Sequence, residues 1–301
     1  MTDTRELPVW RSMLFVPAIV RKFVEGAAKR GADAIILDLE DSIPLAEKPR
    51  ARGLVPEAAE IAGRGGADIV VRINRPLPLA IPDIAASVGP GVLALMLPKI
   101  ESASHLRLLA EVVDEAEAAR GMVAGTTRLI AMVETAGAFF EMAEIARAHP
   151  RLVAMTLGAE DFALSVGMVP EAEGLFFPKQ QMIIAARAAG ILPLGFLGTV
   201  ADFRDLDAFR ATIRRSRRIG FSGASVIHPS QVAILNEEFS PSAEEVSHAE
   251  RVVAAYAKAT SEGIGAITLD GKMIDVPVVE RAQVLLTRHR AIAAREAKHP
   301  R

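Results

Sequence analysis

Short segments of apolar, often branched residues recur along this chain, and each is followed by a longer segment of helical character. Such alternation is typical of βα units, in which helices connect parallel strands. Eight units can be distinguished, so the pattern predicts an α/β protein with a closed (β/α)8 TIM barrel rather than an open sheet. The predicted strands are Met13–Ala18, Ala34–Glu40, Asp68–Asn74, Ala94–Lys99, Arg128–Glu134, Val153–Asp161, Leu192–Gly198 and Gly223–Pro229.

The strongest helix predictions inside the barrel are Ser102–Arg120, Gly137–His149, Pro178–Ala189 and Asp202–Ile219. The alternation stops after the eighth strand. Two further helices are expected there, at Ser242–Ser261 and Pro277–Lys298, and the second opens with a Pro that suits a first helical turn. We therefore expect residues 1–236 to form the barrel and residues 237–301 to form a C-terminal helical extension.

Charge and cysteine content exclude several classes of protein. Lys and Arg number 35 against 37 Asp and Glu, so the chain has no broad cationic field for nucleic acid or an anionic membrane. It contains no Cys, which removes disulfides, thiolate-bound zinc and iron–sulfur clusters, and leaves oxygen or imidazole as metal ligands. The N-terminal sequence MTDTRELPVWRS has no apolar targeting core, so we expect a cytoplasmic protein.

Charged side chains gather where the predicted strands end. In TIM barrels the carboxyl ends of the strands carry the chemistry, and buried charges are costly unless they are paired or bound to metal. The residues at these ends are Asp38, Glu40, Asp41, Arg72, Asn74, Lys99, Glu101, Glu134, Glu160, Asp161 and His228. This set predicts a polar site at one barrel mouth.

The residue types alone leave more than one role open. Glu134 and Asp161 suit an oxygen-rich Mg²⁺ site, because Mg²⁺ commonly takes one or two protein carboxylates, but a structural network with Arg72 and Lys99 fits equally well. Arg72 can hold a substrate carboxylate or oxyanion, or form a salt bridge at the rim. For Lys99 a charge-balancing role is favoured over a Schiff base, because nearby carboxylates keep an ammonium protonated.

The strand ends also carry a set of motifs in a specific order: RSMLFVPA, GADAIILDLEDSIP followed by KPRAR, VVRIN, LPKIES, MVETAGAF, LGAEDF, SVIHPSQV and GKMIDVP. Together they resemble the citrate lyase beta-subunit-like family, which includes malyl-CoA, citramalyl-CoA and citryl-CoA lyases. The resemblance extends from Arg11 to about Ala282. It implies a TIM barrel, bound Mg²⁺, and cleavage or formation of a carbon–carbon bond beside an acyl-CoA thioester.

The resemblance also implies roles for residues already noted. Glu134 in VET and Asp161 in AEDF match the metal-binding carboxylates of the family. Arg72 in VRIN matches the arginine that contacts the keto acid and the thioester enolate. Glu40 and Asp41 in LED match an acidic pair near the metal-bound waters, and with Lys99 they are expected to support the site.

Asp275 in GKMID matches an aspartate that works as acid or base in the malyl- and citramalyl-type members and comes from a neighbouring subunit. Spacing alone gives it no role beyond that of a surface acid. The resemblance therefore implies that the extension 237–301 packs on another subunit, in a homotrimer or a multiple of it.

Coenzyme A contacts are expected near the first and last strands. Arg11, Arg21 and Lys22 can meet its phosphates, although each also fits a plain surface charge, and His228 is expected to orient rather than to react. The first strand of the family usually runs into Pro-Gly, whereas Ala18 follows the proline here. Because Gly permits close backbone approach, this departure affects the loop expected to meet CoA.

We thus expect a Mg²⁺-dependent lyase that cleaves or forms a 3-hydroxyacyl-CoA, such as malyl-CoA or citramalyl-CoA, to give acetyl-CoA and a 2-keto acid. Two alternatives stay open: a metal-dependent aldolase acting on a free keto acid, and a citryl-specific beta subunit of a citrate lyase complex. The sequence does not select the acyl group or the physiological direction.

Overall fold

The computed structural model describes residues 7–199 and 204–299. The chain divides into two compact units, Met1–Phe239 and Ser240–Arg301. This division falls just after helix α10 (Val232–Glu238), whereas the boundary expected after residue 236 lies within that helix.

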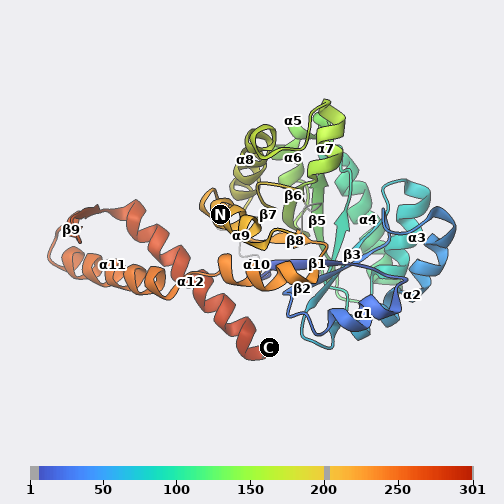
Figure 1. Ribbon diagram of the computed structural model, residues 1–301, viewed down its shortest axis with the longest axis horizontal. Coiled ribbons are helices and arrows are strands. Elements are labelled where there is room, and N and C mark those ends of the chain that lie inside the picture. Colours follow the sequence, from blue (N-terminus) through green and yellow to red (C-terminus); the bar gives the residue numbers. More distant parts are fainter. Residues whose placement is uncertain (1–6, 200–203, 300–301) are drawn as a thin grey trace. The chain divides into compact units, whose positions relative to one another are not determined.

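Eight strands make up a single parallel sheet, shown in Figure 1. They are β1 (Ser12–Pro17), β2 (Ala34–Asp38), β3 (Asp68–Arg72), β4 (Ala94–Leu97), β5 (Arg128–Val133), β6 (Leu152–Leu157), β7 (Leu192–Leu194) and β8 (Ala224–Val226). Sequential strands pair from β1 to β7, and β8 pairs with β1. A parallel bridge between Leu194 and Gly223 joins the two remaining edges. The sheet closes into a barrel, so the predicted fold is confirmed.

Helices follow the strands around the first unit (Figure 1), and the label η denotes a short 3₁₀ helix. They are α1 (Arg21–Ala27), η1 (Leu45–Glu47), α2 (Lys48–Gly63), α3 (Leu77–Ser87), α4 (Ala103–Ala119), α5 (Ala136–Phe140), α6 (Met142–Ala146), α7 (Ala159–Val166), α8 (Ala172–Ala188), α9 (Leu206–Arg218), η2 (Pro229–Gln231) and α10. Within the described part of the chain, no helix combines the length and apolar character needed to cross a membrane.

Several predicted bounds need correction. The helix expected over Gly137–His149 is two short helices, because Glu141 leaves helical geometry between α5 and α6. Helix α8 begins at Ala172, so Pro178 lies inside it rather than at its start. The strand expected over Val153–Asp161 ends at Leu157, and Gly158 then caps α7. The expected start of a helix at Asp202 lies outside the described residues.

Strand residues are buried on both faces of the sheet, as expected for parallel strands covered by helices. Along β2, Ala34 and Ile36 join the cluster inside the barrel, while Ile35 and Leu37 join the larger cluster between the sheet and the helices. Trp10 also belongs to the inner cluster, and its indole N–H donates to Asp68 Oδ2 at 2.8 Å. Apolar packing therefore fixes the strands whose carboxyl ends carry the charged residues.

The second unit contains α11 (Ala243–Ser261), an antiparallel hairpin of β9 (Ile267–Leu269) and β10 (Lys272–Ile274), and α12 (Val276–Lys298). Ser242 and Glu245 form a capping box at the start of α11. The core of the unit is Ala249, Val252, Ile274, Val279 and Ala282. Both helices expected in the extension are present.

Candidate active site

The acidic segment after β2 is organised around Asp38, the last residue of that strand. The residue is 2% exposed, and its side chain accepts hydrogen bonds from the backbone N–H groups of Glu40 at 3.0 Å and Ser42 at 3.1 Å. Burial alone would raise the pKa of Asp38, but the hydrogen bonds and charge of Arg72 hold it below its usual value. Asp38 is therefore an ionised anchor beneath the loop that carries Glu40 and Asp41.

Arg72, at the end of β3, is held in one orientation. The parallel register places it beside Asp38, and the two pair twice, from Nε to Oδ1 at 2.7 Å and from Nη2 to Oδ2 at 2.9 Å. Its Nη1 lies 2.9 Å from Glu40 Oε2 and 3.3 Å from Asp41 Oδ2. The guanidinium also lies 4.9 Å from the centre of the Phe15 ring. Burial alone would lower the pKa of Arg72, but these carboxylates raise it above its usual value.

Lys99 joins the Arg72 cluster to the predicted metal ligands. Its Nζ lies 3.3 Å from Glu40 Oε1 and 3.4 Å from Asp161 Oδ1, and its backbone N–H donates to Glu134 Oε2 at 2.7 Å. The backbone is left-handed at this residue, with φ of 50°. Partial burial opposes the charge, but Glu40, Glu134 and Asp161 raise the pKa of Lys99. Its ammonium stays protonated, which supports charge balance rather than a Schiff base.

Glu134 follows β5 and is 2% exposed, so burial, with the charge of Glu40 and Asp161, raises its pKa to about 7. A Cβ atom at Gly158 would lie 2.5 Å from Glu134 Oε1, so only glycine leaves room for this carboxylate.

Asp161 is not at a strand end as expected, but in the first turn of α7. The strand was predicted too long because α7 begins at Ala159, directly after Gly158, and no loop marks the end of β6.

The carboxylates of Glu134 and Asp161, which both line the cavity, are ligands that suit a hard cation such as Mg²⁺. The Lys99 ammonium already lies among these carboxylates, and the buried Glu40 Oε2 accepts no aligned hydrogen bond from the described residues. The described residues contain no group of three or more His, Asp or Glu arranged for a metal ion. Mg²⁺ commonly uses one or two protein carboxylates with water and substrate oxygens, so this set fits that ion.

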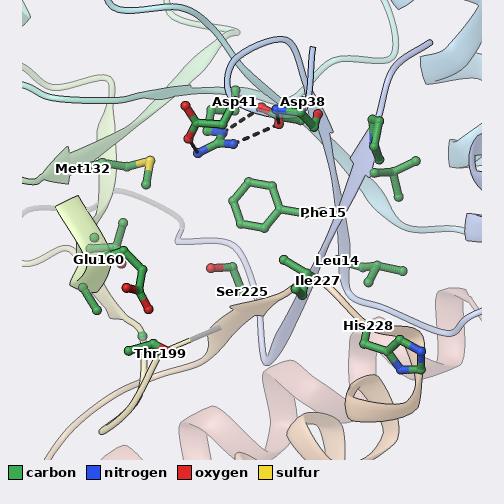
Figure 2. Close-up of a pocket in the computed structure, with 18 of the residues that line it drawn as sticks. Leu14, Phe15, Asp38, Asp41, Met132, Glu160, Thr199, Ser225, Ile227 and His228 are labelled. Atoms are coloured by element: carbon green, nitrogen blue, oxygen red, sulfur yellow. Dashed lines mark hydrogen bonds and ion pairs between the residues drawn. The ribbon is translucent and has the colours of Figure 1, made fainter. Parts of the chain in front are cut away.

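A cavity of about 840 Å³ opens over these residues (Figure 2). Its charged wall includes Asp38, Asp41, Arg72, Glu134 and Asp161. Another part of the wall, which we call the uncharged wall, includes the uncharged residues Gly195, Phe196, Gly198, Ser225 and Ile227, and Glu160 and Lys179 line the cavity beside it. Figure 2 shows the Phe15 ring pointing into the space between Asp38 and Asp41 on one side and Ser225 on the other.

The residues expected to contact CoA do not all lie together. Lys22 and His228 are exposed and line the cavity. Arg21 is exposed and paired with Glu25 and Glu57.

Arg11 directly precedes β1, at the opposite end of that strand from the cavity. It is 2% exposed and paired with Asp33 at 2.9 Å. Because its guanidinium is buried and held by this carboxylate, Arg11 is not part of the site proposed below.

Ala18 and Asp275, the two other residues singled out by the sequence, lie in different units of the chain. Ala18 is buried, does not have a positive φ, and donates its N–H to Asp38 O at 3.3 Å, so the turn does not need the freedom of glycine. Asp275 lies in the second unit, where it caps α12 and accepts a hydrogen bond from Val278 N at 3.4 Å.

Sequence reasoning gave no role to three residues that the structure places at the cavity: Phe15, Asp38 as the partner of Arg72, and Lys179. The expected pairing of neighbouring strands could have indicated Asp38, because parallel strands align their last residues. No signal in the sequence pointed to Lys179, since the helix that buries it was predicted to begin one residue before it.

Comparison with known proteins is consistent with this geometry. The family described as HpcH/HpaI aldolase/citrate lyase matches residues 11–229. The chain is 36% identical to the citrate lyase subunit beta of Leuconostoc mesenteroides subsp. cremoris, over 91% of each chain. It is 34% identical to the L-malyl-CoA/beta-methylmalyl-CoA lyase of Rhodobacter capsulatus, over 92% of this chain and 93% of the other.

A solved structure of the CitE protein of Mycobacterium tuberculosis, in complex with magnesium, acetoacetate and coenzyme A, is also similar. It has a TM-score of 0.73 and 31% identity, and the match covers 92% of this chain and 97% of that one. The similarity therefore extends over both units of the chain.

Proposed function

Because the chain belongs to the HpcH/HpaI aldolase/citrate lyase family, we propose that it is a cytoplasmic, Mg²⁺-dependent carbon–carbon lyase. Its substrate is a 3-hydroxyacyl-CoA such as malyl-CoA or citramalyl-CoA, which it cleaves to acetyl-CoA and a 2-keto acid or forms from them. The observation that carries this proposal is a continuous chain of ion pairs, from Arg72 through Glu40 and Lys99 to Asp161, along a cavity also lined by Glu134. Relatives with lyase names and a neighbour solved with magnesium and CoA support it.

Glu134 and Asp161 would hold the Mg²⁺, with Glu40 and Asp41 next to its water ligands. When bound, the ion acts as a Lewis acid on the hydroxyl and carboxylate oxygens of the substrate. Lys99 balances the negative charge of Glu40 and Asp161. Asp38 fixes the orientation of Arg72. This arrangement prepares one wall of the cavity for an anionic 2-keto acid.

In the cleavage direction the substrate hydroxyl gives its proton to a water molecule of the solvent and becomes the carbonyl of the keto acid, while the bond to the acetyl carbon breaks. The electron pair of that bond moves onto the thioester as an enolate, and Arg72 stabilises the developing oxyanion. Asp275 then gives a proton to the acetyl carbon, or removes one in the synthetic direction. We propose that Asp275 comes from a neighbouring subunit in a homotrimer or a multiple of it.

The function is tested by incubating purified protein and Mg²⁺ with malyl-CoA, citramalyl-CoA and citryl-CoA, and by detecting glyoxylate, pyruvate and oxaloacetate. We expect acetyl-CoA and one keto acid to appear in equal amounts. Cleavage of a free hydroxy-keto acid without CoA would favour the aldolase alternative. Activity only after addition of the other citrate lyase subunits would favour the beta subunit of a complex.

Mg²⁺ affinity is expected to rise with pH up to about 7 and then level off. The raised pKa of Glu134, about 7, means that this carboxyl holds a proton below that pH and must release it to bind a cation. The apparent association constant should therefore fall about tenfold for each pH unit below 7. Calorimetric titrations at pH 6 and pH 8 measure this, and equal affinities would remove Glu134 from the ligand set.

Replacement of Arg72 by Lys is expected to reduce turnover by about 10²–10³. Lys keeps the positive charge but loses the two parallel hydrogen bonds to Asp38, so its position is no longer fixed. Steady-state kinetics measure the loss. Arg128→Lys is the matched control, because Arg128 starts β5 at the opposite end of the barrel. Unchanged turnover in Arg72→Lys would show that Arg72 forms a structural salt bridge and does not stabilise the transition state.

A further inference from the structure

Lys179 is a buried lysine that lines the cavity without an acidic partner. It lies in α8, is 3% exposed, and donates from Nζ to Phe196 O at 2.6 Å and to Gly198 O at 2.5 Å. Its Nζ also lies 5.7 Å from the centre of the Phe196 ring. No hydrogen bond or ion pair joins it to a carboxylate within the described part of the chain. Burial lowers the pKa of Lys179 to about 7, and only the charge of Glu160, from α7, opposes this shift.

Both acceptors of Lys179 belong to the segment 195–199, which we call the β7 segment because it follows that strand. The segment starts at Gly195, where φ is 135° and a Cβ atom would lie 2.9 Å from the Phe221 ring, so only glycine fits. A second anchor comes from α9, where Ser216 Oγ accepts from Leu197 N at 2.9 Å and donates to Thr212 O at 2.7 Å. Two helices thus fix the backbone of one short segment.

The β7 segment supplies much of the uncharged wall of the cavity, through Gly195, Phe196, Gly198 and Thr199. Figure 2 shows Thr199 on the same side of the cavity as Ser225 and Glu160, away from Asp38 and Asp41. The metal ligands and Arg72 lie on the charged wall and would hold the keto-acid half of the substrate. The long, largely apolar thioester arm is then left to lie against the uncharged wall.

A buried ammonium is expensive, and an apolar side chain of the same length would fill its space at lower cost. Lys179 holds the carbonyl groups of Phe196 and Gly198 in one orientation. Without this donor, both groups would be free to turn toward the cavity. We propose that Lys179 is a positioning residue, which holds the β7 segment as the uncharged wall and so sets the affinity for acyl-CoA without acting in bond cleavage. This inference rests on the proposed acyl-CoA substrate.

The test compares Lys179→Met, which keeps the length of the side chain but removes the donors, with Lys179→Arg, which keeps them. Lys29→Met, at an exposed lysine of the loop after α1, is the matched control. In Lys179→Met we expect KM for the acyl-CoA to rise about tenfold while kcat stays within about twofold of wild type. Lys179→Arg is expected to recover most of the affinity. An unchanged KM, or a loss confined to kcat, overturns the proposal.

Hydrogen exchange gives a readout that does not depend on activity. Amides of residues 195–199 should exchange at least about tenfold faster in Lys179→Met, while those of β2 and β3 keep wild-type rates. Ser216→Ala, which removes the second anchor, should accelerate exchange in the same segment, so the argument does not depend on one variant folding. Unchanged exchange overturns the positioning role. If wild-type protein cleaves no acyl-CoA but exchange responds as expected, it is the proposed function that fails.

Discussion

Asp161→Asn protein is expected to lose measurable Mg²⁺ binding at millimolar concentration and at least about 10³ in turnover. The amide keeps the size of the side chain but removes the negative charge that lies 3.4 Å from the Lys99 ammonium. A neutral amide oxygen binds Mg²⁺ more weakly than a carboxylate does, and Glu134 is then the one proposed ligand that still carries charge. Calorimetry measures the binding, and a keto-acid assay measures the turnover.

Asp207→Asn is the matched control for this experiment. Asp207 also lies in the first turn of a helix, α9, and it is exposed. The same chemical change at the same type of helix position should leave both Mg²⁺ affinity and turnover at wild-type values. Asp161→Asn protein that binds Mg²⁺ as tightly as wild type would show that the metal is held elsewhere.

Asp275→Ala protein is expected to lose about 10²–10⁴ in turnover while it keeps its affinity for Mg²⁺ and CoA. The proposed role of Asp275 is to move a proton at the acetyl carbon, and neither of the proposed metal ligands is in its unit. The replacement also removes the cap of α12, so thermal unfolding must show that the second unit remains folded. A parallel loss of Mg²⁺ affinity would contradict a role confined to proton transfer.

Mixing the two inactive proteins tests whether the site is shared between subunits. If Asp275 serves the barrel of a neighbouring chain, some mixed oligomers of Asp275→Ala and Asp161→Asn chains contain a site with both groups intact. Part of the wild-type activity should then return after subunit exchange. A mixture that stays inactive despite demonstrated exchange, or a fully active monomer, would rule out a shared site.

The order of apolar segments was sufficient to predict the barrel, because each strand must be buried on both faces and each needs a helix to return the chain. The charged strand ends predicted which residues gather, since parallel strands end at one mouth. The pattern could not predict where a strand stops when the next helix follows it without a loop. Asp161 was therefore assigned to β6, whereas Gly158 ends the strand and starts α7.

Pairing within the site was less accessible to sequence reasoning. Arg72 lies beside Asp38 because of the register between β2 and β3. Glu40 and Asp41 follow Asp38 within three residues in the sequence, so the sequence alone offers three acids as partners for this arginine. Lys179 was missed because Pro178 suggested a helix start, which would have left the lysine near an exposed end. Its burial depends on the packing of α8 against the barrel, which local patterns do not report.

The left-handed backbone of Lys99 links the proposed charge balance of the site to thermal stability. A residue with a Cβ atom loses about 1–2 kcal/mol in this conformation, and the ion pairs of its side chain only partly offset that loss at 30% exposure. Glycine at this position would relax the backbone but would remove the ammonium that lies between Glu40 and Asp161, one of the proposed metal ligands. Selection for thermal tolerance alone would therefore favour a change here that weakens the enzyme. A more durable catalyst has to gain its stability elsewhere, for example in the helices of the outer layer.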